Sequence, residues 1–234
     1  MVRAVLFDLF ETLVTESRTR PAGVSSLAHE LGCERAAFRA QWKALRPAVT
    51  TGRVTFRQAL TDITARLGGR AEEATLQRLC DARIRIKAEP FAEVDEQVLA
   101  GLDHLRSRHV RLGVISNGFA EDVTAWPGTA LASRVDCALF SCEIGLAKPD
   151  PGIYLEAASR LGVAPAETWY IGDGGDDELA GATRAGLRAF RALWFVRRWP
   201  HFREEPHSPD CLPTVQDLVL LFERQRVSPT IEPA

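Results

Sequence analysis

The 234-residue sequence has little excess of either charge and no long apolar run. Its 29 Lys and Arg residues stand against 31 Asp and Glu residues, a formal net charge of −2. That balance argues against a protein that binds nucleic acid by neutralising phosphates. No apolar run approaches the roughly 20 residues of a membrane span, and the first three residues lead straight into an apolar strand pattern. We therefore expect no signal peptide, no membrane partner and a cytoplasmic location.

Cysteine and histidine are also sparse and scattered. The chain has five histidines, without metal-ligand spacing, and five cysteines, without any Cys-x-x-Cys pair: Cys33, Cys80, Cys137, Cys142 and Cys211. An odd number of dispersed thiols is typical of a protein without a disulfide framework. We expect reduced, mostly structural thiols.

Hydrophobic residues make up 46% of the chain, ample for a buried core. After position 90, helical and strand patterns alternate. The pattern predicts helices over 94–108, 153–161, 178–185 and 214–222, and strands over 110–115, 137–140, 169–171 and 188–192. Together with the apolar run before Asp8, this alternation predicts an α/β fold with a doubly wound parallel sheet.

Residues 16–90 separate the first strand from this alternating part, and the segment is too long to be a loop. Helical patterns cover 25–31, 35–45, 55–67 and 72–86. Thr55 and Gln58 fit a capping box, and we expect Pro47 and Pro90 to mark bends or boundaries. We predict a helical domain over 16–90, inserted into an α/β core made of residues 1–15 and 91–234.

Four polar segments follow predicted strands or precede predicted helices. They contain Asp8, the pair Ser116 and Asn117, Lys148, and four carboxylates between positions 173 and 178. Open α/β sheets bind ligands at the carboxyl ends of their strands, so these residues are expected at one edge. Each segment also has a purely structural explanation: a turn, a solvated lysine, or the acidic first turn of a helix.

In this order the four segments resemble motifs I to IV of the haloacid dehalogenase-like (HAD) hydrolases, over residues 3–192. The resemblance implies the Rossmann-like HAD core, with a helical cap domain between motifs I and II. It also implies an Asp8 nucleophile, with Ser116, Asn117 and Lys148 as the other catalytic residues. The metal ligands implied for Mg²⁺ are Asp8, the backbone carbonyl of Phe10, Asp173 and Glu178, with Asp176 and Asp177 as alternatives to Glu178.

These residue types suit phosphoryl transfer. A carboxylate nucleophile forms a covalent intermediate and divides one hard displacement into two easier ones. The carboxylates beside Asp8 would raise one another's pKa, and a hard cation held by oxygens removes that cost. Ser116 and Asn117 offer donors for phosphoryl oxygens, and Lys148 offers a fixed positive charge.

Phe10 departs from the phosphatase pattern, in which an Asp at this position serves as general acid and base. The dehalogenases of the family have an aromatic residue there, but they use no metal and their motif IV is poor in carboxylates. The first hypothesis is a Mg²⁺-dependent phosphatase acting on a small phosphorylated metabolite. The alternatives are a 2-haloacid dehalogenase-like hydrolase and a catalytically weak phosphoryl-binding or regulatory protein.

Three further features concern surfaces. Arg39, Lys43 and Arg46 recur at helical spacing, as a basic face above the site or, in the simpler interpretation, a solvated helix face. The segment 194–203 mixes aromatics with arginines, and we expect it to pack on the core or to form an oligomer contact. We interpret Glu11 as structural, residues 226–234 as frayed, and the protein as a monomer or homodimer.

Overall fold

The computed structural model describes residues 1–16, 23–199 and 210–227. Six strands form one parallel sheet in the order β3-β2-β1-β4-β5-β6. The strands are β1 (Ala4–Phe7), β2 (Arg111–Ser116), β3 (Cys137–Phe140), β4 (Thr168–Gly172), β5 (Arg188–Ala192) and β6 (Cys211–Leu212). The predicted α/β class with a parallel, doubly wound sheet is confirmed. Strand β6 was not predicted, because two residues are too few to display a periodic pattern.

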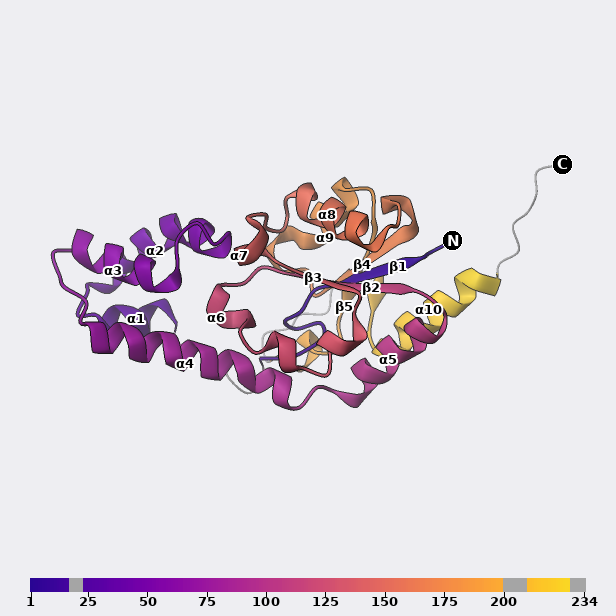
Figure 1. Ribbon diagram of the computed structural model, residues 1–234, viewed down its shortest axis with the longest axis horizontal. Coiled ribbons are helices and arrows are strands. Elements are labelled where there is room, and N and C mark those ends of the chain that lie inside the picture. Colours follow the sequence, from indigo (N-terminus) through magenta and orange to yellow (C-terminus); the bar gives the residue numbers. More distant parts are fainter. Residues whose placement is uncertain (17–22, 200–209, 228–234) are drawn as a thin grey trace.

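Helices cover both faces of the sheet (Figure 1). Helices α8 (Pro151–Leu161) and α9 (Glu178–Arg184) contact one face, and α5 (Glu96–Ser107) and α10 (Val215–Val227) lie on the other. Side chains of β1 alternate between the two apolar cores, with Leu6 on the α8 side and Phe7 on the α5 side. All four residues of β1 are buried, as expected for a parallel strand covered on both faces.

Strand β1 lies where the winding of the chain changes direction. Its neighbours are β2 on one side and β4 on the other, with Ala4 in register with Arg111 and Thr168. In open α/β sheets, ligands bind at such a switch point, beyond the carboxyl ends of the strands. Residues that follow β1, β2 and β4 are therefore brought to one edge.

Four helices between β1 and α5 lie beyond this edge: α1 (Val24–Glu30), α2 (Arg35–Thr50), α3 (Phe56–Arg66) and α4 (Glu73–Ala92) (Figure 1). They pack around an apolar cluster of their own, which includes Phe38, Trp42 and Leu60 and receives Phe119 from the loop after β2. The predicted capping box is present, since Thr55 and Gln58 exchange side-chain and backbone hydrogen bonds. The division of the chain into a core and an inserted domain stays a prediction.

The predicted helix ends at residues 45 and 86 are wrong. Helices α2 and α4 continue through Pro47 and Pro90 to Thr50 and Ala92. A proline inside a helix costs about 3 kcal/mol or more, because it removes a hydrogen bond and crowds the preceding turn. Burial of Val49 and Phe91, the apolar residues that follow the two prolines, offsets this cost.

The segment after β5 holds the turn that follows β1. The indole nitrogen of Trp194 donates to the carbonyl of Thr12 at 2.8 Å, and that of Trp199 donates to the Glu11 carboxylate at 2.9 Å. Packing of this segment on the core is therefore confirmed up to residue 199. Residues 200–203 and the tail after 227 lie outside the described residues. Among the described helices, none combines the length and apolar composition that crossing a bilayer requires.

Candidate active site

Asp8 follows β1 directly and is buried, with 6% of its surface exposed. Its backbone N–H donates to the carbonyl of Ile171 at 2.8 Å, which fixes the residue to the neighbouring strand β4. Its carboxylate accepts a hydrogen bond from the ammonium of Lys148. The structure therefore brings together two predicted site residues that are 140 positions apart.

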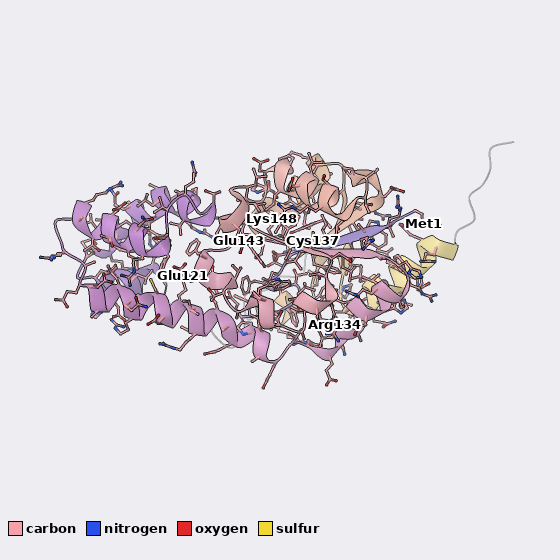
Figure 2. All side chains as sticks on the ribbon, viewed as in Figure 1. Met1, Glu121, Arg134, Cys137, Glu143 and Lys148 are labelled. Carbon is pink, nitrogen blue, oxygen red and sulfur yellow. The ribbon has the colours of Figure 1, made fainter. Side chains whose placement is uncertain are left out.

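Lys148 is a buried cation rather than a solvated one, with 6% exposure. Its ammonium also donates to Glu178 Oε2 at 2.5 Å and to the Tyr170 hydroxyl at 3.1 Å. The Tyr170 hydroxyl in turn donates to Glu178 Oε2 at 2.6 Å. Three hydrogen bonds thus fix the ammonium of Lys148. Figure 2 shows Lys148 toward the end of the sheet that faces the helices α1–α4.

Asn117 holds the backbone of the lysine loop. Its side-chain amide accepts from the Lys148 N–H at 2.8 Å and donates to the Lys148 carbonyl at 2.8 Å. These reciprocal bonds join the end of β2 to the segment before α8, so Asn117 positions Lys148 in addition to any contact with a ligand. Ser116 ends β2 and is buried.

Three carboxylates meet beside the lysine. One oxygen each of Asp8, Asp173 and Glu178 lies within 4.8 Å of the others. A side chain at Gly172 would prevent this, because its Cβ would lie 2.1 Å from Glu178 Oε1. The Asp177 side chain is exposed and lies 3.8 Å from Arg184, outside the group. Of the candidates after Asp173, Glu178 is therefore the one that the fold directs to Asp8.

The electrostatics of this cluster favour a bound cation. Three carboxylates and one ammonium leave a formal charge of −2. Burial raises the pKa of Asp8 to about 8, although Lys148 partly opposes the shift, and it raises that of Asp173 to about 6. Burial acts to lower the pKa of Lys148, but Asp8 and Glu178 outweigh it and the net shift is upward. Burial thus favours the protonated forms of Asp8 and Asp173, and a divalent cation would neutralise the charge of their ionised forms.

Phe10, at the position of the usual acid, is turned toward helix α4. Its ring centroid lies 6.1 Å from that of Phe91 and 4.1 Å from the ammonium of Lys87. Lys87 is buried and pairs with Glu16 at 2.5 Å. The ring cannot transfer a proton, so the side chain at this position serves packing.

A cavity of about 260 Å³ lies between the helices and this edge of the sheet. Asn117 and Asp176 line it from the core side, and Asn117 Nδ2 lies 3.4 Å from Asp176 Oδ2. The other lining residues come from the helices and from the loop after β2: Gly23, Val24, Leu27, Trp42, Arg46, Thr50, Arg83, Lys87, Gly118, Phe119 and Asp122.

All three residues of the predicted basic face are exposed on α2, and among them only Arg46 lines this cavity. Sequence reasoning missed Arg83 and Lys87. Their spacing of one helical turn was a usable signal, because residues four apart share one face of a helix. What no pattern indicated was which way that face points.

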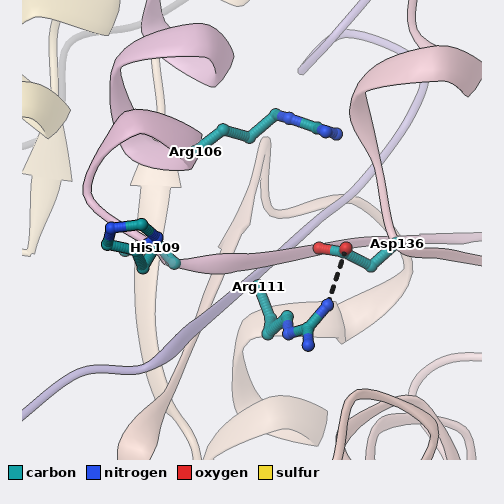
Figure 3. Close-up of a pocket in the computed structure, with 5 residues that line it drawn as sticks. Arg106, His109, Arg111 and Asp136 are labelled. Atoms are coloured by element: carbon teal, nitrogen blue, oxygen red, sulfur yellow. Dashed lines mark hydrogen bonds and ion pairs between the residues drawn. The ribbon is translucent and has the colours of Figure 1, made fainter.

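A second cavity, of about 330 Å³, lies at the opposite edge of the sheet (Figure 3). Arg106, His109, Arg111 and Asp136 line it, and Arg111 pairs with Asp136 at 3.1 Å. This cavity adjoins the start of β2, whereas the carboxylate cluster lies beyond the ends of the strands. It is therefore separate from the candidate active site.

The parallel sheet, the buried Asp–Lys pair after its central strand and the helices beyond this edge define a hydrolase of the HAD type. The family model for haloacid dehalogenase-like hydrolases matches residues 2–186. The chain belongs to this family and is an enzyme, a HAD-like hydrolase.

The proteins that are similar to the chain include phosphatases as well as haloacid dehalogenases. The glyceraldehyde 3-phosphate phosphatase of Methanopyrus kandleri is 30% identical over 230 residues, which is 91% of each chain. The (S)-2-haloacid dehalogenase 2 of Pseudomonas sp. (strain CBS-3) is 30% identical over 162 residues, 67% of this chain and 66% of that protein. The crystal structure of the 2-haloacid dehalogenase from Pseudomonas syringae pv. Tomato DC3000 superposes with a TM-score of 0.65, at 26% identity, over 96% of this chain and 100% of that one.

Proposed function

We propose that the protein is a Mg²⁺-dependent phosphatase that acts on a small phosphorylated metabolite. The excess of negative charge in the cluster of Asp8, Asp173, Glu178 and Lys148 supports this proposal most directly. A site that works without metal gains nothing from burying three carboxylates around a single ammonium. Carboxylate and carbonyl oxygens are the ligands that Mg²⁺ prefers.

In this scheme the Asp8 carboxylate attacks phosphorus, a P–O bond forms, and the ester oxygen leaves with its electron pair. Water then hydrolyses the aspartyl phosphate and releases inorganic phosphate. Lys148 holds a phosphoryl oxygen and keeps Asp8 oriented, and Ser116 and Asn117 lie at the end of β2, where donors to the other oxygens are needed. Asp8, Asp173, Glu178 and the carbonyl of Phe10 would hold Mg²⁺, which supplies positive charge to the developing negative charge on the phosphoryl group.

Phe10 limits the chemistry. Without a carboxyl group at this position, the leaving oxygen departs without a proton from the usual acid, and no carboxylate there activates water. Substrates with good leaving groups should therefore react faster, and hydrolysis of the aspartyl phosphate should be slow.

The test uses beryllofluoride, which mimics the aspartyl phosphate. Calorimetry should detect its binding to the wild-type protein with Mg²⁺ and not in EDTA. Asp8→Asn should bind none in either condition, and it provides the blank for hydrolysis of p-nitrophenyl phosphate. Binding of beryllofluoride that is independent of metal contradicts the scheme.

Dehalogenation is the second candidate, and Phe10 is the observation that favours it. A halide leaves without protonation, so an aromatic residue at this position costs that reaction nothing. Release of halide from a 2-haloacid in EDTA, lost in Asp8→Asn, would establish it. Turnover of phosphate esters no greater than that of Asp8→Asn, without halide release, would instead indicate a phosphoryl-binding protein of little activity.

A further inference from the structure

The cavity of about 260 Å³ adjoins the candidate active site at Asn117 and Asp176, and its other walls come from the helices and from the loop after β2. Its volume is below the roughly 300–1,000 Å³ of pockets for drug-sized ligands, so it suits a leaving group of few atoms. Trp42, Leu27 and Phe119 supply apolar surface, and three cations reach it from α2 and α4. Asp176 also lines the cavity, where its carboxylate contacts the Asn117 amide, so the leaving group that fits depends on which of the three cations lacks a carboxylate partner.

Two of the three cations are already paired. Arg83 donates to both carboxylate oxygens of Asp122, at 2.6 and 2.7 Å, and its guanidinium lies 4.2 Å from the ring centroid of Phe119. Lys87 pairs with Glu16 and lies against Phe10. These two cations therefore form fixed walls of the cavity, with their charges balanced by protein carboxylates.

Arg46 differs from them. Within residues 1–16, 23–199 and 210–227, no hydrogen bond or ion pair joins its guanidinium to another group. Among these three cations, Arg46 is the one whose guanidinium N–H groups are available to a ligand. A guanidinium binds a planar carboxylate through two parallel hydrogen bonds, and its single charge matches that of one carboxylate.

The backbone that carries Arg46 is fixed from the core. Thr50, one helical turn further along α2, accepts a hydrogen bond through its carbonyl from the Ser141 hydroxyl at 2.7 Å. The same hydroxyl accepts from the Gly118 N–H at 3.1 Å. Gly52 then passes so close to the carbonyl oxygen of Cys142 that a Cβ would lie 1.9 Å from it. The C-terminal turn of α2, which carries Arg46, is thus docked on helix α7 (Ser141–Ile144) and, through Ser141, on the loop after β2.

We propose that Arg46 is a specificity-determining residue, and that the cavity selects small phosphate monoesters whose leaving group carries a carboxylate. The inference rests on the proposed phosphatase activity and names its substrate class. The phosphoryl group lies at Asp8, the leaving group extends past Asn117 into the cavity, and its carboxylate meets the guanidinium.

The experiment measures kcat/KM for two pairs of substrates, each a carboxylate and its neutral analogue: phosphoglycolate with 2-hydroxyethyl phosphate, and 3-phosphoglycerate with glycerol 3-phosphate. For each pair, kcat/KM of the carboxylate substrate is divided by kcat/KM of its neutral analogue. This ratio is compared between the wild-type protein and its variants, which cancels the intrinsic reactivity of each ester. Arg46→Gln should lower the ratio at least tenfold, mainly through KM for the carboxylate. Arg46→Lys keeps the charge without the fork and should give an intermediate ratio.

Arg39→Gln is the matched control, because Arg39 lies on the same helix but does not line the cavity. Its ratios should stay within twofold of the wild-type values, and thermal unfolding should show all variants folded. Equal ratios for Arg46→Gln and the wild-type protein overturn the assignment of Arg46. If the wild-type protein hydrolyses p-nitrophenyl phosphate but does not prefer the carboxylates, the substrate class is wrong while the phosphatase proposal stands. If no phosphate ester is hydrolysed faster than by Asp8→Asn, both fail.

Discussion

Replacing Phe10 by Asp tests the acid-deficient phosphatase directly. The substitution restores a carboxyl group where phosphatases of the family have one, and it removes a half-buried ring. In the structure that ring contacts Phe91 and the ammonium of Lys87. Both consequences can be given a magnitude.

General acid–base catalysis contributes about 10²–10⁴ in rate. We expect a gain near the lower end, about 10², because the ammonium of Lys87 would face the new carboxylate and favour its ionised form. Loss of the half-buried ring and its contact with Lys87 should lower the free energy of unfolding by roughly 1–3 kcal/mol. The gain should be largest for alkyl phosphates, whose alkoxides most need a proton.

The assay compares turnover of glycerol 3-phosphate and p-nitrophenyl phosphate at saturating Mg²⁺. Phe10→Asn is the matched control, since it removes the same ring but introduces no titratable group. We expect Phe10→Asp to exceed Phe10→Asn on the alkyl substrate, and to differ much less from it on the aryl one. Equal rates for the two variants on glycerol 3-phosphate would refute the acid-deficient model and favour a dehalogenase-like or non-catalytic site.

Four further predictions concern the cluster and the docking of α2. Asp8→Asn should abolish turnover. Burial raises the pKa of Asp8 above its unfolded value, to about 8, so protonation of Asp8 stabilises the metal-free fold. This contribution to the free energy of unfolding is complete below about pH 4 and is lost as the pH rises through 8. Urea unfolding in EDTA should therefore show Asp8→Asn about 1–3 kcal/mol more stable than the wild-type protein at pH 9, with a smaller difference at pH 5.5. A larger difference in stability at pH 5.5 than at pH 9 contradicts this account. Lys148→Met should lower turnover at least about 10²-fold and stability by about 3–5 kcal/mol, since it leaves buried carboxylates without their cation; unchanged urea unfolding would refute this. Affinity for Mg²⁺ should fall as the pH drops through 8, where Asp8 takes up a proton, and fall further through 6, where Asp173 does. Calorimetry in two buffers should detect proton release on binding, and binding that is independent of pH would count against the site. Gly52→Ala should lower the free energy of unfolding by about 2–4 kcal/mol, because φ is 69° and the Cβ has no room. Gly32→Ala is the control, since φ is 64° but the space around the Cβ is open, and it should cost only about 1 kcal/mol. Equal losses of stability in the two variants would contradict the docking contact.

The centre of the sheet could be predicted because strands β1, β2 and β4 are buried on both faces. Such strands appear as continuous apolar runs, and helical patterns between them leave only a parallel arrangement. The ends of α2 and α4 could not be predicted in the same way. Local rules stop a helix near proline, but the burial of Val49 and Phe91 depends on contacts made elsewhere in the chain.

The same distinction applies to the site. Asp8 and Lys148 were identified because each lies in a segment with a recognisable motif, and the fold brings the two segments together. The hydrogen bond between the Tyr170 hydroxyl and the Lys148 ammonium was not predicted, because the sequence does not distinguish a tyrosine of a buried strand from other core residues. Arg83 and Lys87 were missed because the direction of a helix face depends on docking, which sequence periodicity does not contain.

The hydroxyl of Ser141 couples the position of helix α2 to the candidate active site. This one side chain joins the carbonyl of Thr50, at the end of α2, to the N–H of Gly118. Asn117 follows the same strand immediately before Gly118 and holds the Lys148 backbone, so the docking of α2 and the placement of Lys148 depend on one continuous set of hydrogen bonds.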